Sequence, residues 1–133
     1  MVRVMMAVAL MAGMTGVVSA KPALRDVPVI DNGLFAVGLA HEIRRNCPDI
    51  SARFFRALGF LRQLEREAEA LGYTEAEVEA HLESDVEKDR LRARAARYMA
   101  DQGFAQDSAG YCALGRSEIA RNSQTGTLLR VSN

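Results

Sequence analysis

The sequence SARFFRALGFLRQLEREAEAL, residues 51–71, is the longest stretch of the chain with uninterrupted helical periodicity. Its apolar residues recur at spacings of three and four, which places them on one face of an α-helix. The charged residues fall largely on the opposite face. Phe55 and Phe60 widen the apolar stripe beyond what one neighbouring element requires, so we expect this helix to pack against neighbours on two sides. The stripe consists of Phe54, Ala57, Leu58, Leu61, Leu64, Ala68 and Leu71.

The first twenty residues, MVRVMMAVALMAGMTGVVSA, have the composition of a secretory signal peptide. A single early charge, Arg3, precedes an uncharged apolar run, and residues 18–20 (VSA) supply the small side chains that signal peptidase recognises. A retained membrane anchor is the alternative, but the run is short for a membrane span and contains two glycines. We expect cleavage between Ala20 and Lys21, which leaves residues 21–133 as a single helical domain.

The predicted mature chain is close to electrically neutral. Without Arg3, 16 Lys and Arg residues remain against 17 Asp and Glu residues, a net charge of −1. A nucleic-acid-binding domain carries a clearly basic surface, so we expect no nucleic-acid partner. No segment after residue 20 is apolar enough to predict a membrane span. Together with the signal peptide, these properties predict a periplasmic protein if the source is a Gram-negative bacterium.

Capping signals divide the mature chain into helices. After an extended lead-in over residues 21–30, Asp31 or Asn32 is suited to cap a helix that ends at about residue 46, because Pro48 disfavours helical backbone before it. The long helix over 51–71 follows. Gly72 then occupies the position just past its last apolar residue, where a glycine commonly terminates a helix.

Two further start signals follow in the sequence. Residues 74–77 (TEAE) have the pattern of a capping box, and residues 84–87 (SDVE) repeat it, so a short helix and a longer one are expected in succession. A last helix is expected over 107–122. The apolar tail at 127–131 could lie over the core or pair as a strand. The short connections between about five helices predict an all-α bundle.

The chain contains two cysteines, Cys47 and Cys112. In an exported domain such a pair most often forms a structural disulfide, so we expect one bond that pins the last helix to the first. The alternative is a redox-active pair. Redox-active cysteines usually lie close together in the sequence, as in Cys-x-x-Cys motifs, and these two do not.

The histidines do not form a recognisable metal motif. His41-Glu42 begins like the zinc motif His-Glu-x-x-His, but Arg45 stands where the second histidine would be. His81 lies near Glu83 and Asp85 at a helix junction, a weak candidate for an ion site that is more readily explained as a solvated junction. We therefore expect no metal, no cofactor and no catalytic residues, and predict that the protein is not an enzyme.

Three short motifs occur together in this chain: Cys47-Pro48-Asp49 before the long helix, the segment at 72–74 (GYT) before the next one, and the late pair at 111–112 (YC). In this combination the chain resembles a family of small exported proteins of unknown function from photosynthetic and marine alphaproteobacteria. The resemblance covers nearly the whole mature chain, and none of its motifs is catalytic. It implies an exported helical protein and supplies no reaction.

Three classes of function are compatible with these features. The first is an exported interaction protein, an accessory module of an envelope complex with a protein partner. The alternative is a small periplasmic inhibitor or immunity protein, and the third is a small redox or metal-binding protein. If a partner binds, the candidate surfaces are the charged helix faces and the surplus aromatic residues Phe55 and Phe60. A contiguous exposed apolar patch would favour a binding function.

Overall fold

The structure is a computed structural model that describes residues 16 and 20–132. The predicted signal peptide, residues 1–20, lies almost wholly outside the described residues, and cleavage between Ala20 and Lys21 stays a prediction. The described residues form six α-helices, one 3-10 turn and a two-stranded sheet, so the predicted all-α fold is confirmed. In chain order the elements are η1 (Leu24–Asp26), α1 (Pro28–Asn46), β1 (Ile50–Ala52), α2 (Phe54–Ala70), α3 (Glu75–Glu83), α4 (Asp85–Asp101), α5 (Ser108–Ala120), α6 (Gln124–Thr127) and β2 (Leu129–Val131).

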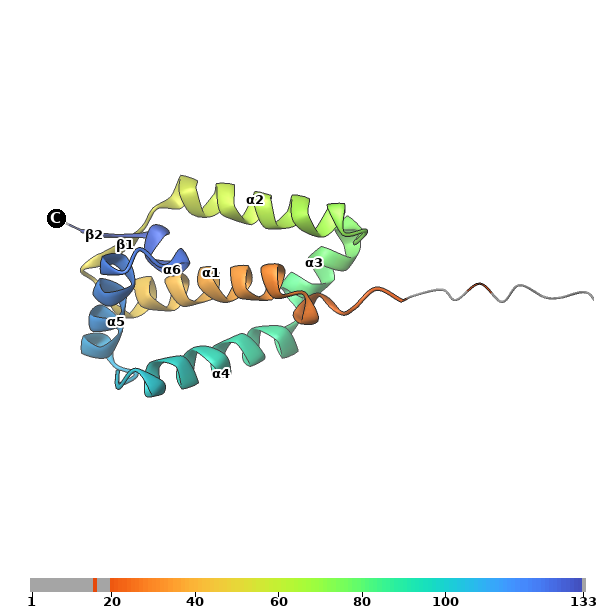
Figure 1. The fold of residues 1–133 in the computed structure, drawn as a ribbon. Coiled ribbons are helices and arrows are strands. Elements are labelled where there is room, and N and C mark those ends of the chain that lie inside the picture. Colours follow the sequence, from red (N-terminus) through yellow and green to blue (C-terminus); the bar gives the residue numbers. More distant parts are fainter. Residues whose placement is uncertain (1–15, 17–19, 133) are drawn as a thin grey trace, which may run out of the picture.

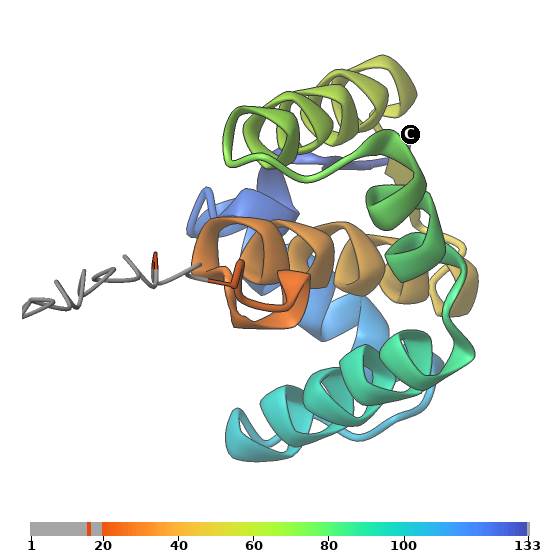
Figure 2. The same ribbon diagram turned by 90° about the vertical axis from the view of Figure 1, so that its right-hand side faces the viewer.

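Helix α1 is the centre of the fold. Figure 1 shows it running through the middle of the molecule, with α2 on one side and α4 on the other. In Figure 2, α1 crosses the view between α2 above and α4 below, and α3 connects the levels of α2 and α4. Helices α5 and α6 and the small sheet gather at the far end, where α1 also contacts α5, α6 and β1. Because α1 is in contact with nearly every other element, its faces decide where a site can form.

The start of α1 differs from the prediction. The helix begins at Pro28, whereas Asp31 or Asn32 was predicted to cap it. Residues 24–26 form a 3-10 turn, so the prediction of an extended segment over 21–30 was wrong from residue 24 onward. Proline is favoured in the first turn because its fixed φ is already helical and its missing N–H would have had no partner there. Asp31 therefore lies within the helix and not at its cap, and its carboxylate pairs with Arg90 and Arg94 of α4.

The start of α2 is also later than predicted, at Phe54 instead of Ser51. Residues 50–52 form β1, which pairs antiparallel with β2 in the register Ser51 opposite Arg130. The amide N of Arg53 donates to the carbonyl O of Leu128 at 2.8 Å and extends the contact. These long-range hydrogen bonds override the local helical pattern. The apolar tail was expected either to lie over the core or to pair as a strand, and its residues 129–131 pair as a strand.

The capping signals are confirmed in part. At α3 the capping box is complete: the Glu77 amide N donates to Thr74 Oγ1 at 3.1 Å, and the Thr74 amide N donates to Glu77 Oε2 at 2.7 Å. At α4 only half of the box forms, because Ser84 accepts from the Glu87 amide while the Glu87 carboxylate pairs with arginines. Gly72 ends α2 at a φ of 92°, where glycine avoids the steric cost of a side chain.

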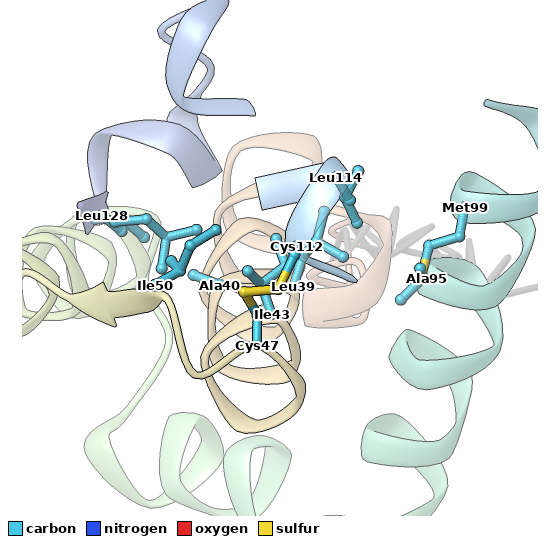
Figure 3. Close-up of a cluster of buried hydrophobic side chains, with 11 residues drawn as sticks. Leu39, Ala40, Ile43, Cys47, Ile50, Ala95, Met99, Cys112, Leu114 and Leu128 are labelled. Atoms are coloured by element: carbon cyan, nitrogen blue, oxygen red, sulfur yellow. A yellow bond between two sulfur atoms is a disulfide. The ribbon is translucent and has the colours of Figure 1, made fainter. Parts of the chain in front are cut away.

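The core consists of two clusters. The larger one surrounds the disulfide and collects buried side chains of α1, α4, α5 and the C-terminal segment (Figure 3). The smaller one lies at the other end of α1, and the ring of Phe60 packs against both. Phe60 therefore packs on two sides, as predicted for this helix. Phe55 is solvent-exposed, so the prediction that it also packs against a neighbouring element was wrong. The smaller cluster consists of Leu24, Val27, Ile30, Leu64, Ala68 and Tyr73.

Cys47 and Cys112 form a disulfide, with their Cα atoms 5.1 Å apart. The bond joins the C-cap of α1 to α5, as predicted, and both cysteines are buried. A disulfide that is buried in this way is poorly accessible to a second thiol. The arrangement therefore favours a structural bond over a redox-active one. Within the described residues, no helix combines the length and hydropathy needed to cross a bilayer.

Candidate binding groove

A stripe on α1 is only partly covered by the rest of the fold: Leu34, Val37 and Gly38 are half-buried, and His41 is exposed. Val37 and Gly38 lie three and four residues after Leu34, and His41 lies four and three residues after them, so all four share one face of the helix. The buried residues Ala36, Leu39, Ala40 and Ile43 lie next to this stripe on the side of the helix that faces the core, and α1 contacts α5 and α6. Helix α2 and helix α4 stand on either side of the stripe (Figure 2). We call the resulting depression the α1 groove.

The groove has two adjoining hollows. The inner hollow has a volume of about 390 Å³ and lies between α1 and α4, with Leu61 of α2 and Leu82 of α3 closing it. The outer hollow has a volume of about 600 Å³ and lies between α1 and the start of α2, next to β1. Val37 and His41 line both hollows. The two hollows therefore lie one after the other along this stripe of α1.

Two phenylalanines stand at the outer end of the groove. Phe54 lines the outer hollow and is 66% exposed, and Phe55 next to it is 84% exposed. Their rings contact each other edge to face, with centroids 5.4 Å apart. Exposed apolar residues are ordinary when they are scattered, but a pair that adjoins an apolar groove forms a continuous surface of the kind that binds a partner.

Charged side chains line the groove unevenly. Arg44 and His41 lie on α1, and Lys88 and Arg92 lie on α4; the one carboxylate among the described lining residues of the two hollows is Glu42. Lys88 and Arg92 each pair with an aspartate one turn away on α4, at 3.9 Å and 3.0 Å, in solvent-exposed contacts. The groove is thus apolar along its floor and basic along its edges.

A network of ion pairs holds α4 against the beginning of α1. Glu87 is buried and accepts hydrogen bonds from Arg25 of η1 and from Arg90 Nε, the latter at 2.9 Å. Asp31 of α1 accepts from Arg90 and from Arg94 Nη1, at 2.9 Å for Arg94. A carboxylate removed from water is stable only when it is paired, and both the buried Glu87 and the partly buried Asp31 are paired. This network fixes the position of α4, which forms one wall of the groove.

A second polar network ties α4 to α5. Glu118 is fully buried and accepts hydrogen bonds from Tyr98 Oη at 2.6 Å, from Arg121 and from Ser123. The Tyr98 ring in turn contacts Phe35 of α1 edge to face. Tyr98 belongs to α4, whereas Arg121 and Ser123 lie in the connection between α5 and α6. This network holds the C-terminal half of α4 against α5.

The histidines have separate surroundings. His41 lines the groove, and its Nδ1 lies 3.5 Å from Arg44 Nη2. His81 lies on α3, where its Nε2 is buried without a hydrogen-bond partner. Burial lowers the pKa of His81 first, and the positive charges of Arg90 and Arg25 lower it further, against the opposing effect of Asp31. His81 is therefore held in its neutral form.

One group of potential metal ligands occurs among the described residues: Cys47, Asp49 and Cys112. Both sulfur atoms of this group are bonded to each other, and the Asp49 carboxylate accepts from Arg116 at 3.2 Å. The weaker candidate at His81, Glu83 and Asp85, for which a solvated junction was the preferred interpretation, is not among such groups in the described residues. The arrangement thus offers no preformed metal site in the part of the chain that the structure describes.

The groove was not predicted from the sequence. Phe55, a predicted candidate contact residue, does lie at its outer end, whereas Phe54 was expected to belong to the buried stripe and is exposed. The signal that could have revealed the groove is the second stripe on α1, at Leu34, Val37 and His41. A helix with apolar residues on two faces needs a neighbour on each, and the described residues cover the second face only in part.

Comparison with known proteins places the chain in a family. The chain belongs to the family of unknown function DUF5333, whose model matches residues 22–130. The match covers nearly all of the domain that the structure describes, and it confirms the resemblance to a family of unknown function. No curated protein and no solved structure is similar enough to count as a match.

Proposed function

We propose that the protein is an interaction module: it binds another protein through the α1 groove and the adjoining Phe54–Phe55 pair, as an accessory component of an envelope complex. The observation that carries this proposal is the exposure of two neighbouring phenylalanines, 66% and 84%, beside a groove with an apolar floor. Burying a phenylalanine side chain is worth about 1.5–3 kcal/mol. A partner that covers both rings would gain that free energy, which the isolated chain does not use.

The proposed compartment is the periplasm. The predicted signal peptide supports export, and the disulfide supports an oxidising environment, where such bonds persist. Protein taken from the soluble fraction should begin at Lys21 when its N-terminus is sequenced. A chain that begins at Met1 in that fraction would contradict the proposed export.

An inhibitor or immunity protein is the second candidate function, and one feature of the chain favours it. Residues 65–87, from the end of α2 to the start of α4, contain nine Asp and Glu residues and one Arg. Small inhibitors of this kind can present an acidic surface that occupies a basic site on the target. In that case the target would contact α3 and not the groove, which separates the two candidates experimentally.

The test compares variants of the mature protein for capture of partners from the native envelope. Replacement of both phenylalanines, Phe54→Ser with Phe55→Ser, should abolish the capture of proteins that the wild type retains. Val86→Ser is the matched control, because Val86 is also strongly exposed but lines neither hollow of the groove. Retention of the same proteins by the double variant would refute the groove surface, and loss on substitution of the α3 glutamates instead would favour the inhibitor function.

A further inference from the structure

The α1 groove has the geometry of a helical bundle that lacks one helix. Helix α1 contacts α2, α4, α5 and α6, whereas the stripe from Leu34 to Arg44 that lines the two hollows stays half-buried or exposed. In a bundle of helices, the space between two neighbours of a central helix is normally filled by another helix that packs into both. Here α3 reaches only the inner end of that space, where Leu82 lines it (Figure 2).

We propose that this space receives one amphipathic α-helix of the partner protein, about three turns long and with carboxylates on both sides of its apolar stripe. The inference rests on the proposed interaction function and adds the kind of segment that is bound. Binding of an amphipathic helix in a groove is a recurrent mode of protein recognition, in which apolar residues at spacings of three and four anchor the helix.

The length follows from the stripe on α1. Leu34 and Arg44 mark its two ends, and ten residues at 1.5 Å each span about 15 Å, or close to three turns. Leu82 of α3 closes the groove beside Leu34. At the other end the groove opens toward β1, where Phe54 lines it. A bound helix of this length would thus extend from α3 to the exposed phenylalanine pair.

Gly38 lies in the middle of the floor and permits close approach. A Cβ atom added at Gly38 would meet no atom within 4 Å among the described residues outside its own helical backbone, so packing inside the domain does not require a glycine there. Glycine in the middle of a helix costs about 1 kcal/mol relative to alanine. A partner helix that crosses α1 at this point could approach to the short interaxial distance of about 8 Å that small residues allow.

The charge of the groove edges indicates the chemistry of the partner helix. Arg44, Lys88 and Arg92 stand at the edges, against the single carboxylate of Glu42. The ion pairs that Lys88 and Arg92 make on their own helix are exposed, and pairs of this kind contribute at most about 1 kcal/mol. Both side chains are therefore available to carboxylates that flank the apolar residues of a bound helix.

A lipid bilayer fits this surface less well than a helix does. The apolar floor is recessed between the walls formed by α2 and α4, and a bilayer surface does not enter a groove of this width. The chain's own residues 1–19 are apolar and carry no carboxylate, so they do not match the basic edges. A membrane, this N-terminal segment and a second copy of the chain are therefore alternatives that the experiment has to distinguish.

The experiment places a photo-cross-linking amino acid at position 37 of the full chain, expressed in its native host, and maps the cross-linked segment by mass spectrometry. We expect a segment of another protein with apolar residues at spacings of three and four and flanking Asp or Glu residues. A cross-link to residues 1–19, to a second copy of the chain or to lipid would overturn the inference, and so would the absence of any cross-link. An unchanged melting temperature shows that the modified protein is folded.

Two glycine variants then test whether the groove itself is occupied. Gly38→Leu fills the floor of the groove and should reduce the cross-link yield from position 37 and the capture of the partner at least tenfold. Gly59→Leu is the matched control, because Gly59 is also a helical glycine with no atom within 4 Å of an added Cβ, but it lines neither hollow. Equal capture by the wild type and by Gly38→Leu would overturn the inference.

Charge reversal tests the chemistry of the flanks. The double variant Lys88→Glu with Arg92→Glu should lower partner capture at least tenfold, whereas Arg97→Glu on the same helix, outside the groove, should leave it within about twofold. Tighter capture by the double variant would overturn the acidic flanks. If the phenylalanine variant loses the partner but neither the Gly38 nor the charge variant does, then only this inference fails. If no variant has an effect, the proposed function fails as well.

Discussion

Removal of the bond between Cys47 and Cys112 should lower the free energy of unfolding by about 4 kcal/mol. The bond spans a sequence separation of 65 residues. In the chain-entropy relation, a loop of that length restricts the unfolded chain by roughly 14 cal/mol/K, or about 4 kcal/mol at 25 °C. The closed loop contains β1 and the whole of α2, α3 and α4, so the restriction applies to most of the domain.

The cleanest assay compares the oxidised and reduced forms of the same chain. Because both cysteines are buried, reduction should be carried out in denaturant, followed by refolding in the presence of the reductant. For a domain of about 110 residues with an unfolding entropy of about 2.1 cal/mol/K per residue, a loss of about 4 kcal/mol lowers the melting temperature by about 15–20 °C. Helicity measured by circular dichroism should be retained below that temperature, because the aliphatic core remains.

The double variant Cys47→Ala with Cys112→Ala serves as the control that cannot reoxidise. It should be somewhat less stable than the reduced wild type, because it also loses the packing of two buried sulfur atoms. Equal melting temperatures for the oxidised and reduced forms would refute the entropic argument. Two freely alkylated cysteines in protein isolated from its native compartment would refute the existence of the bond in the cell.

Four further predictions follow from single positions. Gly38→Ala should raise the unfolding free energy by about 0.5–1 kcal/mol in urea titrations, whereas Gly126→Ala should lower it by about 1–3 kcal/mol, because the added Cβ would lie 2.0 Å from the carbonyl oxygen of Glu118. Thr74→Ala removes the cap of α3 and should cost about 1 kcal/mol in the same measurement. Burial and then nearby arginines lower the pKa of His81 from 6.5, so the unfolded state binds a proton that the folded state resists. Stability should therefore be constant above about pH 6.5 and decrease below it, and this decrease should be smaller in His81→Gln.

The parts of the fold that sequence analysis predicted are those specified by local chemistry. The capping box at Thr74 and Glu77 and the terminating glycine at position 72 each act within one helical turn, so their residues are visible in a short window. The disulfide could be predicted because the chain offers only two cysteines. The strand at residues 50–52 could not, because its partner lies about 80 residues away and its sequence continues a helical pattern.

The candidate site depended on information that periodicity does not carry. Phe54 and Leu64 belong to the same predicted stripe, yet Leu64 is buried against α1 while Phe54 is exposed. The difference arises because Leu64 contacts Gly33, where the two helices approach closely, whereas Phe54 lies beside the open outer hollow. Apolar spacing identifies a face that needs a neighbour, but it does not say whether the neighbour belongs to the same chain.

The α4 wall of the α1 groove is held in place by contacts within the domain. The disulfide joins α1 to α5, the hydrogen bond from Tyr98 to Glu118 joins α5 to α4, and the ion pair of Arg94 with Asp31 joins α4 back to α1. These three connections close a triangle, so α4 cannot move away from α1 without breaking one of them. Binding to a surface that is already formed avoids the free-energy cost of ordering it. The polar contacts of Asp31 and Glu118 therefore fix α4 relative to α1, and with it the shape of that side of the groove.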